Sequence, residues 1–534
     1  MAEGDFSTEG EESFLLAYLS LFGGIVYFLW LRRDKTNYDG IPSVGFSGPV
    51  LSFVTALRWM RDQNGVVEEG YAKFPNRIFR YPTLTRWIVV VAGSKYVEEL
   101  RKAPEDEISA SDAMKETLGV PSTISSKLLT DPELKALLGS QLTRKLQDFL
   151  PDIQSVASEL MKTLIPSEED DWKYIDEHST MMCICIQAVN RALLGANLSR
   201  DPQFIEQIST FLQSTDRYTS KSRRLPKILQ PLYIIMFTSV PQVKRRLRAM
   251  LADTPADTHR IDIGEDFPPD DMITWFNGRE IESEMPLDEL VDHVLLVNYL
   301  AVYPMIQVMS QVLRKLATLP DSRRSLRKEA EEATKHGVWT KASVDRMHKI
   351  DSFLKETMRL DTNALSPFFP TLTMSRKCRR PITFSDGTTV PHGALLFVGS
   401  QLLHTDSRYY RNPKVFEPLR FIPPQRTSSS PLISPASSSE SQSSLSSWAS
   451  SSSATLLPVS LTLPATSSKF LAWGHGKHAC PGRFFAASVM KVMLAQFILE
   501  FDIRPPPVHD ISSTSNSSES AKMLPWIEIR RYQH

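Results

Sequence analysis

One cysteine near the C-terminal end, Cys480, stands in a loop whose composition suits a ligand to a flat metal cofactor. Gly474 and Gly476 precede it, Gly482 follows it, and a hydrophobic helical pattern begins immediately afterwards. Glycines adopt backbone conformations that other residues resist, and they let the chain approach a ring closely. Backbone N–H groups and the start of the next helix can face the sulfur and favour its thiolate form. A buried, inert cysteine is the alternative that this spacing leaves open.

A second arrangement that could support chemistry is the pair Glu356 and Arg359. Residues 344–360 follow a helical pattern, and positions three apart share one face of a helix. A surface ion pair, worth a few tenths of a kcal/mol, is the ordinary interpretation of such a pair. Further along the chain, Arg420 lies in the stretch Phe-Glu-Pro-Leu-Arg-Phe at 416–421.

These motifs together resemble those of the cytochrome P450 family. The stretch 473–483, Trp-Gly-His-Gly-Lys-His-Ala-Cys-Pro-Gly-Arg, is similar to the haem-binding loop Phe-Gly-x-Gly-x-Arg/His-x-Cys-x-Gly. By this resemblance Cys480 is the axial ligand of the iron of haem b, and His478 contacts a haem propionate. Glu356, Arg359 and Arg420 match the ordered family motifs that form a buried network supporting the haem loop.

The resemblance assigns two further cofactor-binding residues. Arg144 lies in a largely helical stretch, 131–164, in which Pro151 is expected to be the break. The family carries a propionate-binding basic residue on this helix, and a solvated surface arginine is the alternative for Arg144. Arg376, just before a hairpin predicted from Asp386-Gly387, matches another position that contacts a propionate.

The longest predicted helix, 287–316, departs from the family pattern. In P450s this helix carries Ala/Gly-Gly-x-Asp/Glu-Thr beside the iron, and its acid and alcohol relay protons to oxygen. The matching window is Leu-Ala-Val-Tyr-Pro at 300–304, so Ala301 fits but Tyr303 and Pro304 replace the acid and the alcohol. Pro304 removes a helix hydrogen bond and favours a local distortion. By the resemblance Ala301, Tyr303 and Pro304 form an atypical oxygen-side catalytic segment.

The N-terminal residues predict a membrane anchor. Residues 14–31 form an uncharged apolar run at the short end of what spans a bilayer. Acidic residues precede it and Arg32 and Arg33 follow it, which places residues 1–13 in the lumen and the remaining chain in the cytosol. A cleaved signal peptide is the alternative. Residues 32–50 are expected to be a Pro-rich hinge, and residues 51–534 the haem domain.

Composition bounds the rest of the prediction. The chain has 534 residues, a formal net charge of zero and four cysteines, which argues against a nucleic-acid partner and a disulfide framework. Residues 427–468 form a Ser-rich insertion interpreted as a surface excursion. Residues 367–373 are interpreted as either a loop over the pocket or retained intron. The fold expected from the resemblance is mainly α with a small β-rich lobe, the cytochrome P450 fold.

The expected function follows from the resemblance, which is strongest to fungal, membrane-anchored members of the ent-kaurene-oxidase-like group. It implies a haem-thiolate monooxygenase of the endoplasmic reticulum membrane. Its substrate would be a lipophilic molecule such as a terpenoid of secondary metabolism. Electrons would come from NADPH through cytochrome P450 reductase, docking near Lys145, Lys477 and Arg483, with cytochrome b5 as a second partner. Two alternatives stay open: rearrangement or dehydration without oxygen activation, and a catalytically silent haem protein.

Overall fold

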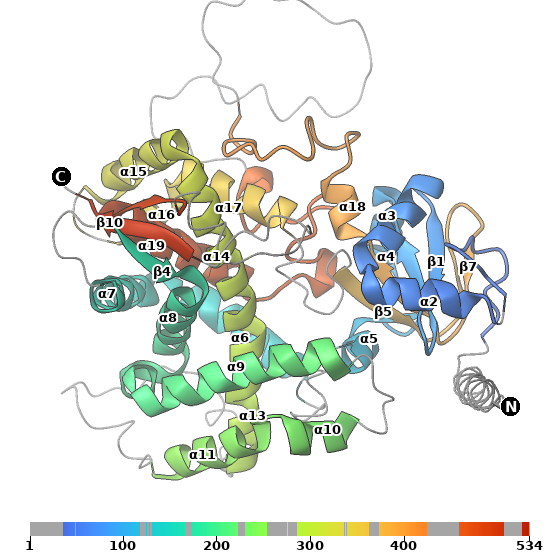
Figure 1. Ribbon diagram of the computed structural model, residues 1–534, viewed down its shortest axis with the longest axis horizontal. Coiled ribbons are helices and arrows are strands. Elements are labelled where there is room, and N and C mark those ends of the chain that lie inside the picture. Colours follow the sequence, from blue (N-terminus) through green and yellow to red (C-terminus); the bar gives the residue numbers. More distant parts are fainter. Residues whose placement is uncertain are drawn as a thin grey trace, which may run out of the picture.

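A computed structural model describes residues 36–48, 50–117, 124, 128, 131–165, 172–222, 230–253, 275, 286–335, 337, 339–361, 373–423, 459–506 and 526–532. Helices form a large body, and most strands gather in a smaller lobe beside it (Figure 1). The predicted mainly α architecture with a small β-rich lobe is therefore confirmed. The apolar run 14–31, the stretch 367–372 and residues 427–458 lie outside the described residues.

The small lobe is built on a mixed sheet with the strand order β1-β2-β8-β5-β3. Its interior strand β2 reads Trp-Ile-Val-Val-Val and is buried along its whole length, as expected for β-branched residues covered on both faces. β2 pairs in parallel with β8 and antiparallel with β1. The strands and hairpins of this lobe, with its helices, are β1 (Ile78–Pro82), β2 (Trp87–Val91), β3 (Ile108–Ser109), β5 (Thr373–Cys378), β6 (Ile382–Thr383), β7 (Thr389–Val390), β8 (Leu395–Val398), α2 (Ser52–Arg61), α3 (Gln63–Lys73), α4 (Ser94–Lys102), α5 (Ala110–Thr117) and α18 (Ser400–His404).

The predicted hinge is partly built into this lobe. Tyr38, Ile41 and Val44 are buried in its core, and the backbone around Ser43 bridges Arg80 on β1. The Val44 N–H donates to the Arg80 carbonyl at 2.9 Å. Part of the predicted Pro-rich hinge over 32–50 is therefore packed against the lobe, because apolar side chains on both sides of Pro42 give this stretch a face to bury.

The helical body surrounds one long central helix in three parts: α13 (Leu287–Val297), the π-helix η4 (Asn298–Val302) and α14 (Tyr303–Thr318). α8 and the central helix are long and apolar enough to cross a membrane, but both are mostly buried within the protein, as core helices are. The other elements are α6 (Pro132–Arg144), α7 (Leu146–Leu164), α8 (Glu177–Arg200), α9 (Pro202–Ser222), α10 (Gln230–Phe237), α11 (Val240–Asp253), α15 (Pro320–Thr334), α16 (Lys341–Asp345), α17 (His348–Leu360), η6 (Val459–Leu461), η7 (Gly476–His478), α19 (Arg483–Glu500), and a sheet of β4 (Lys173–Asp176), β10 (Trp526–Arg531) and β9 (Phe501–Arg504).

The break predicted at Pro151 lies elsewhere. The helices α6 and α7 meet at Lys145, and Pro151 lies inside α7. A proline in the second turn removes only one early hydrogen bond, so the helix continues through it.

The Ser-rich insertion ends earlier than predicted. Residues 459–461 form a 3-10 helix and Leu463 is completely buried. The last part of 427–468 therefore belongs to the folded body, because its apolar side chains can pack where the serine-rich part of the segment could not.

Candidate haem site

The loop that carries Cys480 is shaped by two glycines in the left-handed region. Gly474 and Gly476 have φ values of +70° and +73°. A Cβ on Gly476 would lie 2.3 Å from the side chain of Arg101, so a larger residue would have to displace that side chain. The Cys480 N–H donates to the Trp473 carbonyl at 2.7 Å, which closes the loop. The glycine spacing seen in the sequence thus has a local structural cause.

The electrostatics at Cys480 are mixed. Burial raises the pKa of the Cys480 thiol, while a backbone hydrogen bond from Gly482 and the charges of Arg483 and Lys135 act to lower it. The residue as a whole is partly accessible, unlike the buried Cys185 and Cys378. Cys480 is therefore the cysteine with both access and nearby positive charge among the four, which are the conditions for a thiolate ligand.

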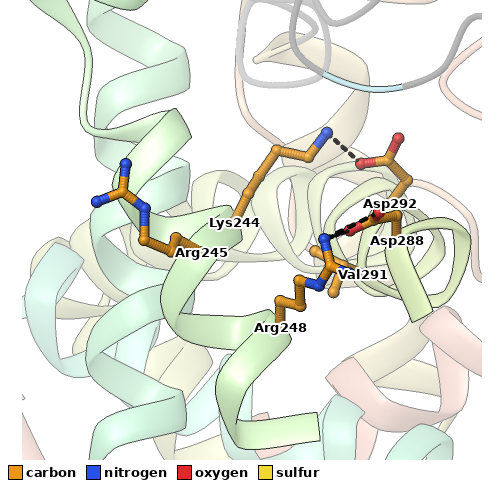
Figure 2. A pocket seen from close by; sticks show the side chains of 6 residues that line it. All are labelled: Lys244, Arg245, Arg248, Asp288, Val291 and Asp292. Atoms are coloured by element: carbon orange, nitrogen blue, oxygen red, sulfur yellow. Dashed lines mark hydrogen bonds and ion pairs between the residues drawn. The ribbon is translucent and has the colours of Figure 1, made fainter. Parts of the chain in front are cut away.

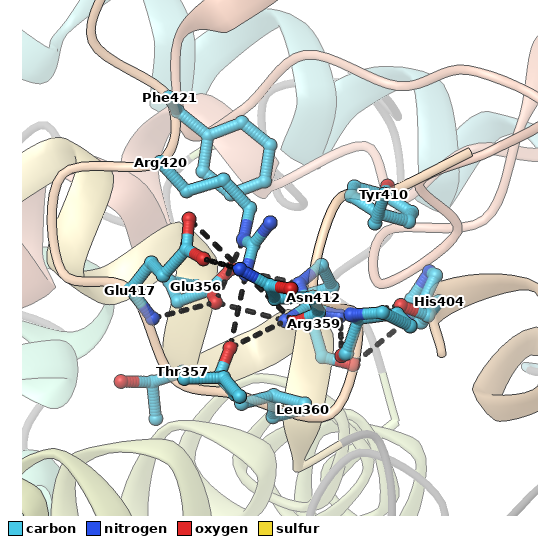
Figure 3. Close-up of polar contacts among 12 residues, drawn as sticks. Glu356, Thr357, Arg359, Leu360, His404, Tyr410, Asn412, Glu417, Arg420 and Phe421 are labelled. Carbon is cyan, nitrogen blue, oxygen red and sulfur yellow. Dashed lines mark hydrogen bonds and ion pairs between the residues drawn. The ribbon is translucent and has the colours of Figure 1, made fainter. Parts of the chain in front are cut away.

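Glu356, Arg359 and Arg420 meet in one buried network beside the loop (Figure 3). The guanidinium of Arg359 donates to both carboxylate oxygens of Glu356, at 2.7 and 2.8 Å, and Arg420 donates to one of them at 2.9 Å. Arg359 also donates to the carbonyls of Pro413 and His404. The side chains of Glu356 and Arg359 are fully buried, so this pair is not the surface ion pair that its spacing alone would suggest.

His404 connects this network to the haem loop, and sequence reasoning missed it. Its Nδ1 lies 3.1 Å from the Arg359 carbonyl, and its Nε2 accepts the Leu471 N–H at 2.8 Å. Burial and the charge of Arg359 lower its pKa to about 3, so the ring is neutral with the proton on Nδ1. The ring stacks on Phe470 at 5.4 Å between centroids. A lone histidine offers no spacing signal that could have identified this role.

A second buried network supports the loop from the segment that follows the Ser-rich region. Lys355 donates to the carbonyls of Thr462 and Leu461 at 2.8 and 3.2 Å. The Leu463 N–H donates to Asp351, which is paired with Lys491 at 3.1 Å. The indole N–H of Trp473 donates to the Leu463 carbonyl at 2.8 Å, so the segment touches the loop directly. The tryptophan that replaces the family's phenylalanine thus uses its polar atom here.

Three basic side chains and one carboxylate gather beside Cys480. Arg376 is buried and donates to the Ser375 carbonyl at 2.8 Å. Burial lowers the pKa of its guanidinium to about 10, although the charge of Glu105 acts to raise it. His478 Nε2 lies 2.7 Å from a Glu105 oxygen, and burial, with Arg376 next, lowers the pKa of His478 to about 4. Burial and then Arg376 also lower the pKa of Lys135. The predicted pair Arg376 and His478 is thus brought together.

The structure places Lys135, and not Arg144, in this cluster. Lys135 lies in the first turn of α6 and interacts electrostatically with Arg376, Glu105 and Cys480. Both side chains are exposed, but Arg144 ends the same helix and donates to Gln141. Nine residues of α-helix separate the two by about 13 Å along the axis, which accounts for the different surroundings. The sequence indicated a helix with basic residues, but it could not show whether Lys135 or Arg144 lies beside Cys480.

The central helix is distorted where Pro304 predicts it. The Tyr303 N–H donates to the Asn298 carbonyl, five residues back, and Pro304 follows at the start of α14. Leu300 is 44% exposed although residues 291–299 are all buried. The Tyr303 ring is buried and stacks on Tyr299 at 5.8 Å. Ala301 and Pro304 are partly accessible, so the three predicted oxygen-side residues do not share one environment.

A separate pocket of about 290 Å³ lies between α11 and α13 (Figure 2). Its charged side chains cross the helix interface in pairs, Lys244 with Asp292 at 2.5 Å and Arg248 with Asp288 at 2.9 Å. These ion pairs attach α11 to the start of the central helix. Because two of its three cations are paired with carboxylates across the interface, we assign this pocket a role in helix packing.

The residues present at Cys480 fit a haem. The loop carries a cysteine that is partly accessible as a residue, and the adjacent cluster holds three basic side chains against one carboxylate. A buried guanidinium whose described hydrogen bond goes only to a neighbouring carbonyl has donors to spare for an anion. Cys480 would ligate the iron, and Arg376, His478 and Lys135 would hold the propionates.

Comparisons with known proteins agree with this site. The family model described as Cytochrome P450 matches residues 46–525. Cytochrome P450 monooxygenase 151 of the fungus Postia placenta is 30% identical over 493 residues, covering 91% of this chain and 92% of that protein. Cytochrome P450 monooxygenase CYP512U6 of Ganoderma lucidum is 27% identical, covering 90% and 88%. The retinoic acid-bound cyanobacterial CYP120A1 has a TM-score of 0.65 at 16% identity, over 93% of this chain and 100% of that one, which shows a shared fold.

The chain therefore belongs to the cytochrome P450 family. The predictions of that family, of its fold and of an enzyme of the P450 monooxygenase class are confirmed. The family implies a haem-iron cofactor, a redox partner and a lipophilic substrate.

Proposed function

We propose that the protein is a haem-thiolate monooxygenase that inserts one oxygen atom into a lipophilic terpenoid, using NADPH through cytochrome P450 reductase. The balanced reaction is RH + O₂ + NADPH + H⁺ → ROH + H₂O + NADP⁺. The observation that carries the proposal is the position of Cys480, on a loop with two buried supporting networks and beside a cluster of basic side chains that could bind propionates. The bound haem would supply the redox chemistry that activates oxygen.

The chain's own residues do the positioning in this proposal. Glu356, Arg359 and Arg420 fix the segment before the loop, and His404 ties that network to Leu471. The accessible apolar side chain of Leu300 and the neighbouring Ala301 offer a surface for a lipophilic substrate rather than for a charged one. The terpenoid class follows from the resemblance to the ent-kaurene-oxidase-like group, and fungal P450 monooxygenases such as janQ of Penicillium janthinellum are among the relatives.

We further propose an endoplasmic reticulum location with residues 14–31 as a single membrane anchor and the catalytic body in the cytosol. The reductase, and cytochrome b5 as a second electron donor, would dock on the face of Lys477 and Arg483. Lys477 is exposed, and Arg483 bonds the Cys480 carbonyl at 2.9 Å, so this face adjoins the sulfur ligand. Positive charge on this side suits an acidic partner.

The decisive experiment has two stages. The full chain, expressed with its reductase in microsomes, should show the family's hallmark band in the reduced CO-difference spectrum, and Cys480→Ala should abolish it. Terpenoids that shift the haem spin state should then be oxidised in step with NADPH consumption. A spectrum without the band, unchanged by Cys480→Ala, would overturn the assignment of Cys480.

One observation favours a second candidate, rearrangement or dehydration without oxygen activation. Within residues 298–304 the structure describes no carboxylate and no aliphatic hydroxyl, and the Tyr303 ring is stacked in the core. A haem-thiolate protein that converts a substrate without consuming NADPH or O₂ would support this candidate. One that shows the CO band yet converts no substrate under either condition would support a catalytically silent haem protein.

A further inference from the structure

The π-helical segment of the central helix begins at a buried pair of asparagine side chains. Asn298, the first residue of η4, faces Asn190 on α8, and the two are 1% and 0% exposed. Asn190 Nδ2 donates to Asn298 Oδ1 at 2.7 Å, and Asn298 Nδ2 donates back to Asn190 Oδ1 at 3.1 Å. Two helices distant in sequence are thus joined by a reciprocal amide pair.

Each amide also bonds its own helix. Asn190 Nδ2 donates to the Ile186 carbonyl at 2.7 Å, and Asn298 Nδ2 donates to the Val294 carbonyl at 2.9 Å. Both N–H groups of each amide are therefore used, and each side chain has one orientation that satisfies all of its donors. Neither side chain can rotate in this apolar surrounding without leaving a buried polar group unpaired, which is costly.

The pair coincides with the change of hydrogen-bond register. The Asn298 N–H still bonds the carbonyls of Leu295 and Val294, as in an α-helix, whereas its carbonyl receives the Tyr303 N–H five residues later. Pro304 ends the segment, and having no N–H it cannot donate to the Leu300 carbonyl. The π segment is therefore bounded by a tether to α8 at one end and by a proline at the other.

The π segment that begins at this pair carries both buried and accessible side chains. Tyr299 and Tyr303 stack against each other, and Tyr299 meets Phe211 of α9 edge-on at 6.5 Å. On the same segment Leu300 is 44% exposed, in contrast to the buried residues before it. A shift of one residue in register would rotate Leu300 and Ala301 by about 100° and exchange accessible for buried side chains.

We propose that the Asn190–Asn298 amide pair is a positioning device that fixes the register of the π segment and thereby presents Leu300 and Ala301 to the substrate side of the haem. This inference rests on the proposed function, in which the central helix faces the cofactor. A single buried asparagine is known to set register between packed helices at some cost in stability. The pair here does the same between α8 and the central helix.

The test compares full-length variants with a matched control on the same helix. Asn190→Leu/Asn298→Leu removes both amides together, so no buried amide is left unpaired and thermal stability should stay close to wild type. Ser310→Ala is the control, because Ser310 is also buried and donates to the Ile306 carbonyl at 2.9 Å, outside the π segment. The readouts are the reduced CO band, amide hydrogen exchange over 298–303, and the affinity for imidazole as a haem ligand.

The double variant should keep the CO band but exchange at least tenfold faster over 298–303 and bind imidazole with an affinity changed at least fivefold. Ser310→Ala should resemble wild type in all three readouts. A double variant with wild-type exchange and imidazole affinity would overturn the proposal, as would equal changes in Ser310→Ala.

Asn190→Ser provides the same test if the double variant does not fold. Its shorter side chain still reaches the Ile186 carbonyl of its own turn but not Asn298. Its exchange over 298–303 should rise as in the double variant, and unchanged exchange would count against the amide pair. If the wild type shows no CO band, the haem assignment is refuted. Hydrogen exchange over 298–303 would then still test whether the amide pair fixes the register of the π segment.

Discussion

At the scale of single residues, the site depends on charged side chains that come from distant parts of the sequence, of which Arg376 is buried. Arg376, His478 and Lys135 come from a strand, a loop and a helix, and Glu105 stands among them. Serine and backbone donors, Ser109 Oγ at 2.9 Å and the Ala110 N–H at 3.1 Å, hold that carboxylate in place. The cluster keeps an excess of positive charge, which is what two propionates require.

The first prediction concerns the choice between two cations of α6. Lys135→Gln should release haem to apomyoglobin about tenfold faster than wild type, because a charge-assisted hydrogen bond to a propionate is worth about 1.5–3 kcal/mol. Arg144→Gln is the matched control and should release haem at the wild-type rate, since the described hydrogen bond of Arg144 goes to Gln141 and not to the cluster beside Cys480. The reverse order of rates would restore the family-based assignment of Arg144.

His404 gives a prediction with a defined pH window. Its pKa is about 3 in the folded protein and about 6.5 in the unfolded chain, so between these values the unfolded state binds more protons and stability falls with falling pH. His404→Gln can keep both hydrogen bonds but does not titrate. In urea unfolding the wild type should therefore lose about 2 kcal/mol relative to this variant between pH 7.5 and pH 5.

A His404→Phe variant separates hydrogen bonding from titration. Phenylalanine preserves the stacking on Phe470 but leaves the Leu471 N–H and the Arg359 carbonyl without their partner. It should be less stable than wild type at pH 7.5 by about 1–3 kcal/mol, and the difference should shrink at pH 5. A difference that does not depend on pH would show that His404 is not held neutral.

At the scale of elements, the sequence predicted those loops, helices and hairpins that depend on residues close together in the chain. The glycine loop, the helix of Glu356 and the hairpin at Asp386-Gly387 depend on neighbouring residues, and each lies where it was expected. The distortion before Pro304 was expected for the same reason, since a proline affects its own turn.

Contacts between distant segments could not be predicted in this way. Lys135 and Arg144 are equivalent in a helical pattern, and only the fold shows which one faces Cys480. The buried side chains of Asp351 and Lys355 bond the backbone of Leu463 and Thr462, which in the sequence belong to the end of the Ser-rich region. Likewise, Asn190 and Asn298 are far apart in the chain, and no spacing rule relates them.

Lys355, which contacts the segment at 460–462, gives a prediction of how the stability of the protein depends on pH. Burial lowers the pKa of Lys355 to about 8, with Asp351 acting in the opposite direction. Between pH 8 and about 10.5 the unfolded chain therefore binds more protons, and the contribution of Lys355 to stability rises with pH. Relative to Lys355→Met, the wild type should gain stability from pH 8 to pH 10 in urea unfolding, by no more than about 3 kcal/mol. Lys355 Nζ lies 4.7 Å from the centroid of the Phe421 ring and 4.8 Å from that of Phe470, and a constant difference would mean that this surrounding does not desolvate it.

At the scale of the whole molecule, the two lobes divide the work. The helical body carries the Cys480 loop, the central helix and the Glu356 network, whereas the β lobe supplies Arg376 and receives the chain from its N-terminal side (Figure 1). α2 lies on this lobe and shows two faces. Phe53, Ala56 and Trp59 are buried in it, while Leu51, Val54 and Leu57 are 46–55% exposed. Such a stripe is typical of a helix that lies in a membrane interface.

The final prediction is that α2 binds membranes even without the proposed anchor. A chain shortened to residues 32–534 should float with phosphatidylcholine vesicles, because the exposed apolar stripe is followed by Arg58 and Arg61, which suit the headgroup region. Val54→Ser/Leu57→Ser should weaken this binding about thirtyfold, since each change removes apolar area worth about 1 kcal/mol on insertion. Tyr174→Ser is the control, because Tyr174 is 48% exposed on β4 of the helical body. If the shortened chain stays in solution, or if the double variant binds as well as the shortened chain without further changes, the α2 stripe does not bind membranes.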